Sequence, residues 1–159
     1  MTDIEALLAT LIQHEIAFIV VGGVAAIAHG SARLTYDLDI VYDRTPANLD
    51  RLVIALAQYK PYLRGAPPGL PFLWDRQTLA RGLNFTLETS LGNIDLLGEI
   101  AGGGVYQDLL PGAVELHAFG TSCLWLSLPQ LIRAKRATGR RKDMEALAEL
   151  EAIQEERNL

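Results

Sequence analysis

Apolar residues recur every three or four positions in several stretches of this chain, and alternate or run continuously in others. The first pattern is that of an amphipathic helix and the second is typical of β-strands. Thr2 with Glu5 and Ser127 with Gln130 fit capping boxes for two of the helices. The expected helices lie at about 3–14, 24–30, from Thr45 onward, 127–138 and 142–156, and the expected strands and hairpins at 16–21, 35–42, 83–97 and 114–126.

The stretch between these elements from 59 to 74 is rich in proline and glycine and shows neither period. Long loops of this kind in compact domains are often functional or mobile. No internal repeat or change in composition marks a boundary elsewhere. We therefore expect one domain over 1–159.

Composition narrows the classes of partner. The chain has 159 residues and a net charge of −5, so a nucleic acid would have to meet a local basic patch, such as the six basic residues between Arg133 and Lys142. The most apolar run, Ile16 to Ala28, is shorter than the roughly 20 residues of a membrane span. With a single cysteine and no secretory signal pattern, we expect a cytoplasmic protein without a membrane partner.

Two acidic residues interrupt the apolar stretch at 35–42. Asp37 and Asp39 are two residues apart, so in a strand they point to the same side, and their repulsion would cost about 4 kcal/mol at ~4 Å and an effective dielectric near 20. A divalent cation such as Mg²⁺ or Mn²⁺ removes that cost, because it binds several carboxylate oxygens at once. If the strand that holds Asp95 is a neighbour, three carboxylates meet and form the ligand set of a two-metal site. The alternative is an edge strand with one wet face, which needs no ligand.

The pair Gly22-Gly23 lies between an apolar strand and a short helix. Backbone N–H groups are exposed at such a junction, and glycine allows a phosphate to come close. The alternative is a tight turn that needs glycine for its backbone angles alone.

The whole stretch VGGVAAIAHGSARLTYDLDIVYD (21–43) resembles the signature of the nucleotidyltransferase superfamily, which has the fold of DNA polymerase beta. It is most similar to a small bacterial branch that includes abortive-infection nucleotidyltransferase toxins, in which an Arg-x-Thr-x-Asp segment (here Arg33, Thr35 and Asp37) leads into the strand. The late segment LIRAKRATGRRKD (131–143) resembles the helix-loop-helix of the same proteins.

This resemblance implies an α/β (α+β) fold with a mixed sheet flanked by helices and a C-terminal helical hairpin. It implies transfer of a nucleoside monophosphate from a nucleoside triphosphate to a hydroxyl of RNA, such as tRNA, or of a protein. In this bacterial branch, it also implies a toxin with a cognate antitoxin. Asp37, Asp39 and Asp95 would bind Mg²⁺ or Mn²⁺, with Asp95 also helping to deprotonate the acceptor. Gly22 and Gly23 would hold the triphosphate, although many members have serine at the second position.

Three more residues are candidates for phosphate binding: Arg33, Lys135 and Lys142. For Arg33 the alternative is a surface ion pair, and for the two lysines it is favourable charge at a helix C-terminus. Asp143 is expected to cap the last helix rather than to bind metal. Two other functions remain open. One is a non-catalytic module of the same fold that binds a nucleotide or a partner protein, and the other is a metal-dependent phosphohydrolase.

Overall fold

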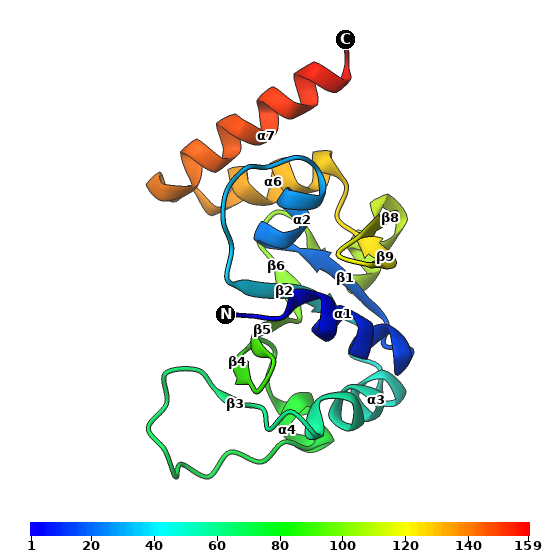
Figure 1. Ribbon diagram of the computed structural model, residues 1–159, viewed down its shortest axis with the longest axis vertical. Coiled ribbons are helices and arrows are strands. Elements are labelled where there is room, and N and C mark those ends of the chain that lie inside the picture. Colours follow the sequence, from blue (N-terminus) through cyan, green and yellow to red (C-terminus); the bar gives the residue numbers. More distant parts are fainter.

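The computed structural model describes all residues 1–159. Seven strands form one mixed sheet in the order β3-β4-β5-β2-β1-β9-β8, and two short strands, β6 and β7, form a second sheet. Helices cover the large sheet, and α6 and α7 lie together at one end of the molecule (Figure 1). The strands are β1 (Phe18–Val21), β2 (Asp37–Tyr42), β3 (Tyr62–Leu63), β4 (Phe85–Thr89), β5 (Gly92–Leu97), β6 (Glu99–Ile100), β7 (Gly104–Val105), β8 (Val114–Ala118) and β9 (Thr121–Trp125). The α-helices are α1 (Ile4–Gln13), α2 (Gly22–Ala28), α3 (Pro46–Ala57), α4 (Arg76–Arg81), α5 (Tyr106–Leu109), α6 (Leu128–Thr138) and α7 (Met144–Arg157), with 3₁₀ turns at Leu110–Gly112 and Arg141–Asp143.

The centre of the sheet is built from the most apolar segments of the chain. β1 pairs antiparallel with β2, and β2 pairs parallel with β5. All four residues of β1 are buried, as expected for a β-branched strand that has neighbours on both edges. These strands belong to one hydrophobic core, whose largest fully buried side chains include Trp125 and Tyr42.

The predicted fold class is confirmed, and most of its elements lie where the periodicity places them. The two hairpins form as β4–β5 and β8–β9. The capping box of Ser127 and Gln130 opens α6, and Gly139 ends it in a left-handed conformation. No helix is both long and apolar enough to cross a bilayer.

Some local predictions were wrong. The first helix is capped by Asp3, whose carboxylate accepts a hydrogen bond from the backbone N–H of Ala6, and not by a Thr2–Glu5 capping box. The hydroxyl of Thr2 instead accepts a hydrogen bond from the backbone N–H of Asn93, because the N-terminus lies against the β4–β5 turn. The short elements β3, α4, β6 and β7 were also not predicted, because they are too brief for a hydrophobic period to show.

Candidate active site

Three carboxylates lie on one face of the central sheet. In the parallel pair of β2 and β5, Asp39 is directly opposite Asp95, and Asp37 is opposite Asn93. The residues between them have no exposed surface, since they point into the core from the other face: Leu38, Ile40, Ile94 and Leu96. The alternation that buries four apolar side chains therefore forces the acidic ones to the opposite side. The edge-strand alternative fails, because both strands lie in the interior of the sheet.

The carboxylate of Asp39 is strained electrostatically. Its Oδ1 atom is buried and has no hydrogen-bond partner. Burial, followed by the neighbouring carboxylates of Asp95 and Asp37, raises the pKa of Asp39 to about 8, and the positive charge of Arg64 only partly opposes this. A buried polar atom without a partner is costly and uncommon, and such atoms often mark a site where an ion or ligand belongs.

The other two carboxylates have partners that the sequence analysis did not anticipate. Asn93 donates a hydrogen bond through Nδ2 to Oδ1 of Asp37 at 3.0 Å. Arg64 donates through Nη2 to Oδ1 of Asp95 at 2.7 Å, and its Nη1 lies 3.6 Å from Oδ2 of Asp37. Arg64 comes from the 59–74 stretch, which was expected to be a loop, and it follows directly after β3. The only signal in the sequence was one arginine in a long loop, which does not identify a contact 31 residues away.

The glycine pair Gly22-Gly23 lies where the backbone at the start of α2 comes close to the carboxylate of Asp39. Gly22 has a φ of +67°, and a Cβ atom at this position would collide with Oδ2 of Asp39. A Cβ on Gly23 would lie 2.8 Å from Oγ1 of Thr35. Glycine is therefore needed at both positions for close packing, and at Gly22 also for its backbone angle. The backbone-angle explanation therefore applies to Gly22 alone, and the turn places the start of α2 beside Asp39.

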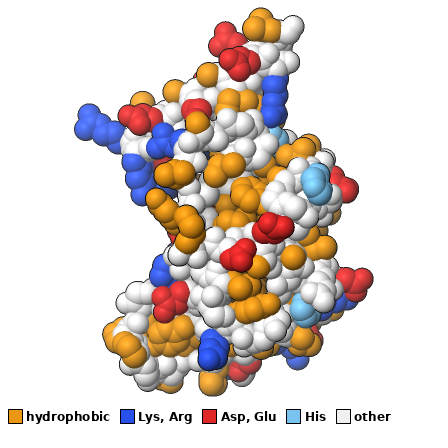
Figure 2. All heavy atoms as spheres, viewed as in Figure 1, with side chains coloured by type: hydrophobic (Ala, Val, Ile, Leu, Met, Phe, Trp, Pro, Cys, Tyr) orange, Lys and Arg blue, Asp and Glu red, His pale blue; other side chains and the backbone are white.

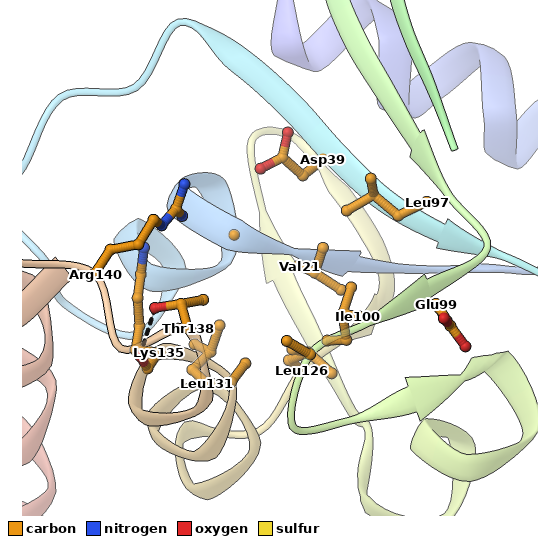
Figure 3. A pocket seen from close by; sticks show the side chains of 13 residues that line it. Val21, Asp39, Leu97, Glu99, Ile100, Leu126, Leu131, Lys135, Thr138 and Arg140 are labelled. Atoms are coloured by element: carbon orange, nitrogen blue, oxygen red, sulfur yellow. Dashed lines mark hydrogen bonds between the residues drawn. The ribbon is translucent and has the colours of Figure 1, made fainter. Parts of the chain in front are cut away.

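A cleft of about 580 Å³ opens over these residues. It is mainly polar, and a second, largely apolar cavity of about 300 Å³ joins it at Asp39 and Lys135. Figure 3 shows the second cavity, with Asp39 on one side and Lys135 and Arg140 across from it. Lys and Arg side chains gather where α6 ends and α7 begins, at the border of a hollow in this face (Figure 2). The cleft is lined by Gly23, Thr35, Asp37, Asp39 and Asp95 together with all three candidate phosphate ligands, Arg33, Lys135 and Lys142.

The basic wall of the cleft is organised by Asp143. This carboxylate accepts hydrogen bonds from Lys135 Nζ at 3.2 Å, Thr138 Oγ1 at 2.9 Å and Arg140 Nε at 2.7 Å. Burial of Asp143 works in the opposite direction, but these donors lower the pKa of Asp143 to about 2. It stands at the N-cap position of α7, yet its side chain makes no capping bond, so the expected capping role is wrong. Its partners belong to the loop and α6, and it holds Lys135 toward the cleft.

Arg33 and Lys142 are less firmly held. Arg33 lies 3.8 Å from Glu145 of α7 in an exposed ion pair, as its structural alternative predicts, while its side chain still borders the cleft. Lys142 is exposed on the same border and makes no ion pair. Both are therefore free to reorient toward an anionic ligand.

The fit of a divalent cation can be judged from the carboxylates themselves. No three His, Cys, Asp or Glu side chains are grouped closely enough to form a ready metal cage. A guanidinium group lies between Asp37 and Asp95 instead. The unpartnered Oδ1 of Asp39 is nevertheless a hard oxygen donor in a crowded negative site, which suits Mg²⁺ or Mn²⁺.

Two solved structures resemble this fold over nearly the whole chain. The lincosamide antibiotic adenylyltransferase LnuA, bound to lincomycin, matches with a TM-score of 0.63 at 15% identity, over 95% of this chain and 96% of LnuA. A candidate nucleotidyltransferase from Thermotoga maritima matches with a TM-score of 0.58 at 15% identity, over 91% of this chain and 87% of that protein. No protein-family profile and no curated protein sequence matches the chain. The chain therefore has the nucleotidyltransferase fold, as its sequence motifs indicated.

Proposed function

We propose that this protein is a magnesium-dependent nucleotidyltransferase, which moves a nucleoside monophosphate from a nucleoside triphosphate to a hydroxyl and releases pyrophosphate. One observation carries the proposal. Asp37, Asp39 and Asp95 project from the same face of two paired strands beside the Gly22 turn, and a buried oxygen of Asp39 lacks a partner. We expect a buried carboxylate with a purely structural role to accept hydrogen bonds from nearby donors, as Asp143 does.

Each carboxylate has a separate task in this proposal. Asp37 and Asp39 hold the metal ions, and Asp95 holds one of them and accepts the proton of the attacking hydroxyl. The bound metal would activate that hydroxyl and neutralise charge on the phosphates. Asp95 is suited to the acceptor side, because β4 and the segment after β3 border it, while Gly22 and α2 lie on the side of Asp39.

The triphosphate would lie along the opposite wall of the cleft. Lys135 is held in place by Asp143, whereas Arg33 and Lys142 are free to close on a ligand. Backbone N–H groups at Gly22 and Gly23 would supply further donors. No serine hydroxyl is present at position 23, so the cationic side chains carry more of the phosphate binding in this chain than they would with serine there.

The acceptor is a hydroxyl of RNA or protein in our first hypothesis, in which the protein acts as a toxin controlled by a cognate antitoxin. A second candidate is a small molecule. The solved structure of LnuA, which this chain matches over 96% of LnuA's length, holds the small molecule lincomycin. A small-molecule acceptor also agrees with the net charge of −5, which does not favour a broad contact with RNA.

The experiment is incubation of the protein with each α-³²P-labelled triphosphate and Mg²⁺, with total RNA, cell lysate or a set of hydroxylated small molecules. We expect label on one acceptor class, pyrophosphate in solution, and loss of both after Asp37→Asn or Asp39→Asn. Asp50→Asn is the matched control, because Asp50 is an exposed acid outside the site. Release of inorganic phosphate without a labelled acceptor would indicate a phosphohydrolase instead. Binding of nucleotide with no turnover in any pool would indicate the non-catalytic module.

A further inference from the structure

Arg64 pairs with two of the three acids, Asp37 and Asp95, and no other basic residue forms an ion pair with any of the three. Its backbone N–H donates to the carbonyl of Thr86 at 2.9 Å, which continues the pairing of β3 with β4. Its guanidinium donates to the carbonyl of Leu87 and to Oδ1 of Asp95, both at 2.7 Å, and lies 3.6 Å from Asp37. The side chain is 23% exposed, so this positive charge sits largely inside the site.

The guanidinium is incompletely satisfied. Its Nε atom is buried without a hydrogen-bond partner, and its approach to Asp37 is longer than a direct hydrogen bond. The network around Asp143 shows how a permanent structural ion pair looks in the same protein, with three donors within 3.2 Å. Arg64 is firmly bonded to Asp95 but only loosely to Asp37, so its bridge between the two acids is incomplete and can be displaced.

We propose that Arg64 is a positioning residue, which bridges Asp37 and Asp95 when no metal is bound, and that a divalent cation binds in competition with its guanidinium. The inference rests on the proposed function, because it takes the three acids as metal ligands. One guanidinium keeps two like charges from two different strands converged, and thus preserves the geometry of the site. Since residues 65–74 form no helix or strand, release of Arg64 would disturb only this local segment.

The test uses Mn²⁺ alone as the probe, titrated into the full-length protein by calorimetry. We expect Arg64→Gln to bind Mn²⁺ about tenfold more tightly than wild type, since a competing charge is gone. Arg64→Lys keeps the charge and should stay close to wild type, which also guards against a folding defect in the neutral variant. Arg76→Gln is the matched control, because Arg76 pairs with Asp50 outside the site.

Hydrogen exchange of the 62–74 segment is a second measurement. If Arg64 had only a structural role, Mn²⁺ would not change the exchange rate of this segment. In wild type, Mn²⁺ should increase exchange there as Arg64 is released, whereas in Arg64→Gln exchange should be high from the start and unaffected by Mn²⁺. Equal or weaker Mn²⁺ binding by Arg64→Gln overturns the competition and leaves the proposed function standing. If neither wild type nor Arg64→Gln binds Mn²⁺, both the metal-dependent function and the proposed role of Arg64 are wrong.

Discussion

Two aspartates on opposite walls of the cleft have opposite surroundings. Asp143 is buried among three donors, and its pKa is lowered to about 2. Asp39 is buried with an unpartnered oxygen beside two other acids, and its pKa is raised to about 8. The first arrangement stabilises the folded protein by holding a charge, and the second destabilises it. The protein tolerates this cost only at the site for which we propose a cation, as is common where stability and function compete.

The largest expected effect comes from breaking the satisfied cluster. Asp143→Asn should lower the free energy of unfolding by about 2–3 kcal/mol at pH 7, because the half-buried donors Lys135 and Thr138 and the exposed donor Arg140 lose their charged acceptor. Urea unfolding measures this. Glu151→Gln is the control on the same helix, since its ion pair with Arg136 at 3.7 Å is exposed and should contribute less than about 0.5 kcal/mol. Similar losses in the two variants would show that Asp143 is an ordinary surface acid.

The matching change at Asp39 should have the opposite sign. Asp39→Asn should raise the free energy of unfolding of the metal-free protein by about 1–2 kcal/mol at pH 8, because it removes a carboxylate that is costly to ionise there. It should also abolish transfer activity. A stability gain together with loss of function is characteristic of an active-site residue. If Asp39→Asn were destabilising, Asp39 would have a structural role that its contacts do not reveal.

The pH dependence of stability should separate the two residues, because their pKa values are shifted in opposite directions. Because the folded pKa of Asp39 lies above that of an unfolded aspartate, metal-free wild type should lose stability as pH rises from about 4 to 8, and Asp39→Asn should not. The folded pKa of Asp143 lies below the unfolded value, so its contribution is lost as pH falls from about 4 to 2. Thermal unfolding across pH 2 to 9 without metal, compared between each variant and wild type, measures both slopes.

The smallest stability effect is expected at Arg33. Arg33→Ala should change the free energy of unfolding by less than about 0.5 kcal/mol, because its pair with Glu145 at 3.8 Å is exposed. The same variant should weaken binding of nucleoside triphosphate several-fold, which equilibrium binding of a fluorescent nucleotide detects. Glu145→Ala should leave that binding unchanged or strengthen it. An unaffected affinity in Arg33→Ala would leave Arg33 with the surface role alone.

The sequence predicted the acidic half of the site for a physical reason. Alternation in β2 and β5 specifies which face each side chain takes, so the convergence of Asp39 and Asp95 needed only that the strands be neighbours. Arg64 could not be predicted in the same way, because a proline- and glycine-rich stretch has no periodicity from which a direction follows. The role of Asp143 was also missed. Its place before a helix suggests a cap, whereas its actual donors depend on how α6 and α7 pack.

The pairing of β2 with β5 has a consequence for how this protein tolerates insertions and deletions. A slip of one residue between these strands would carry Asp95 into the apolar interior and bring Ile94 or Leu96 to the surface beside Asp39. Losing or gaining a single codon in the tight connection at Ser90 and Leu91 should therefore be far more harmful than most substitutions there. The open stretch at 65–74 can absorb changes of length, so natural variation in chain length should concentrate in that stretch.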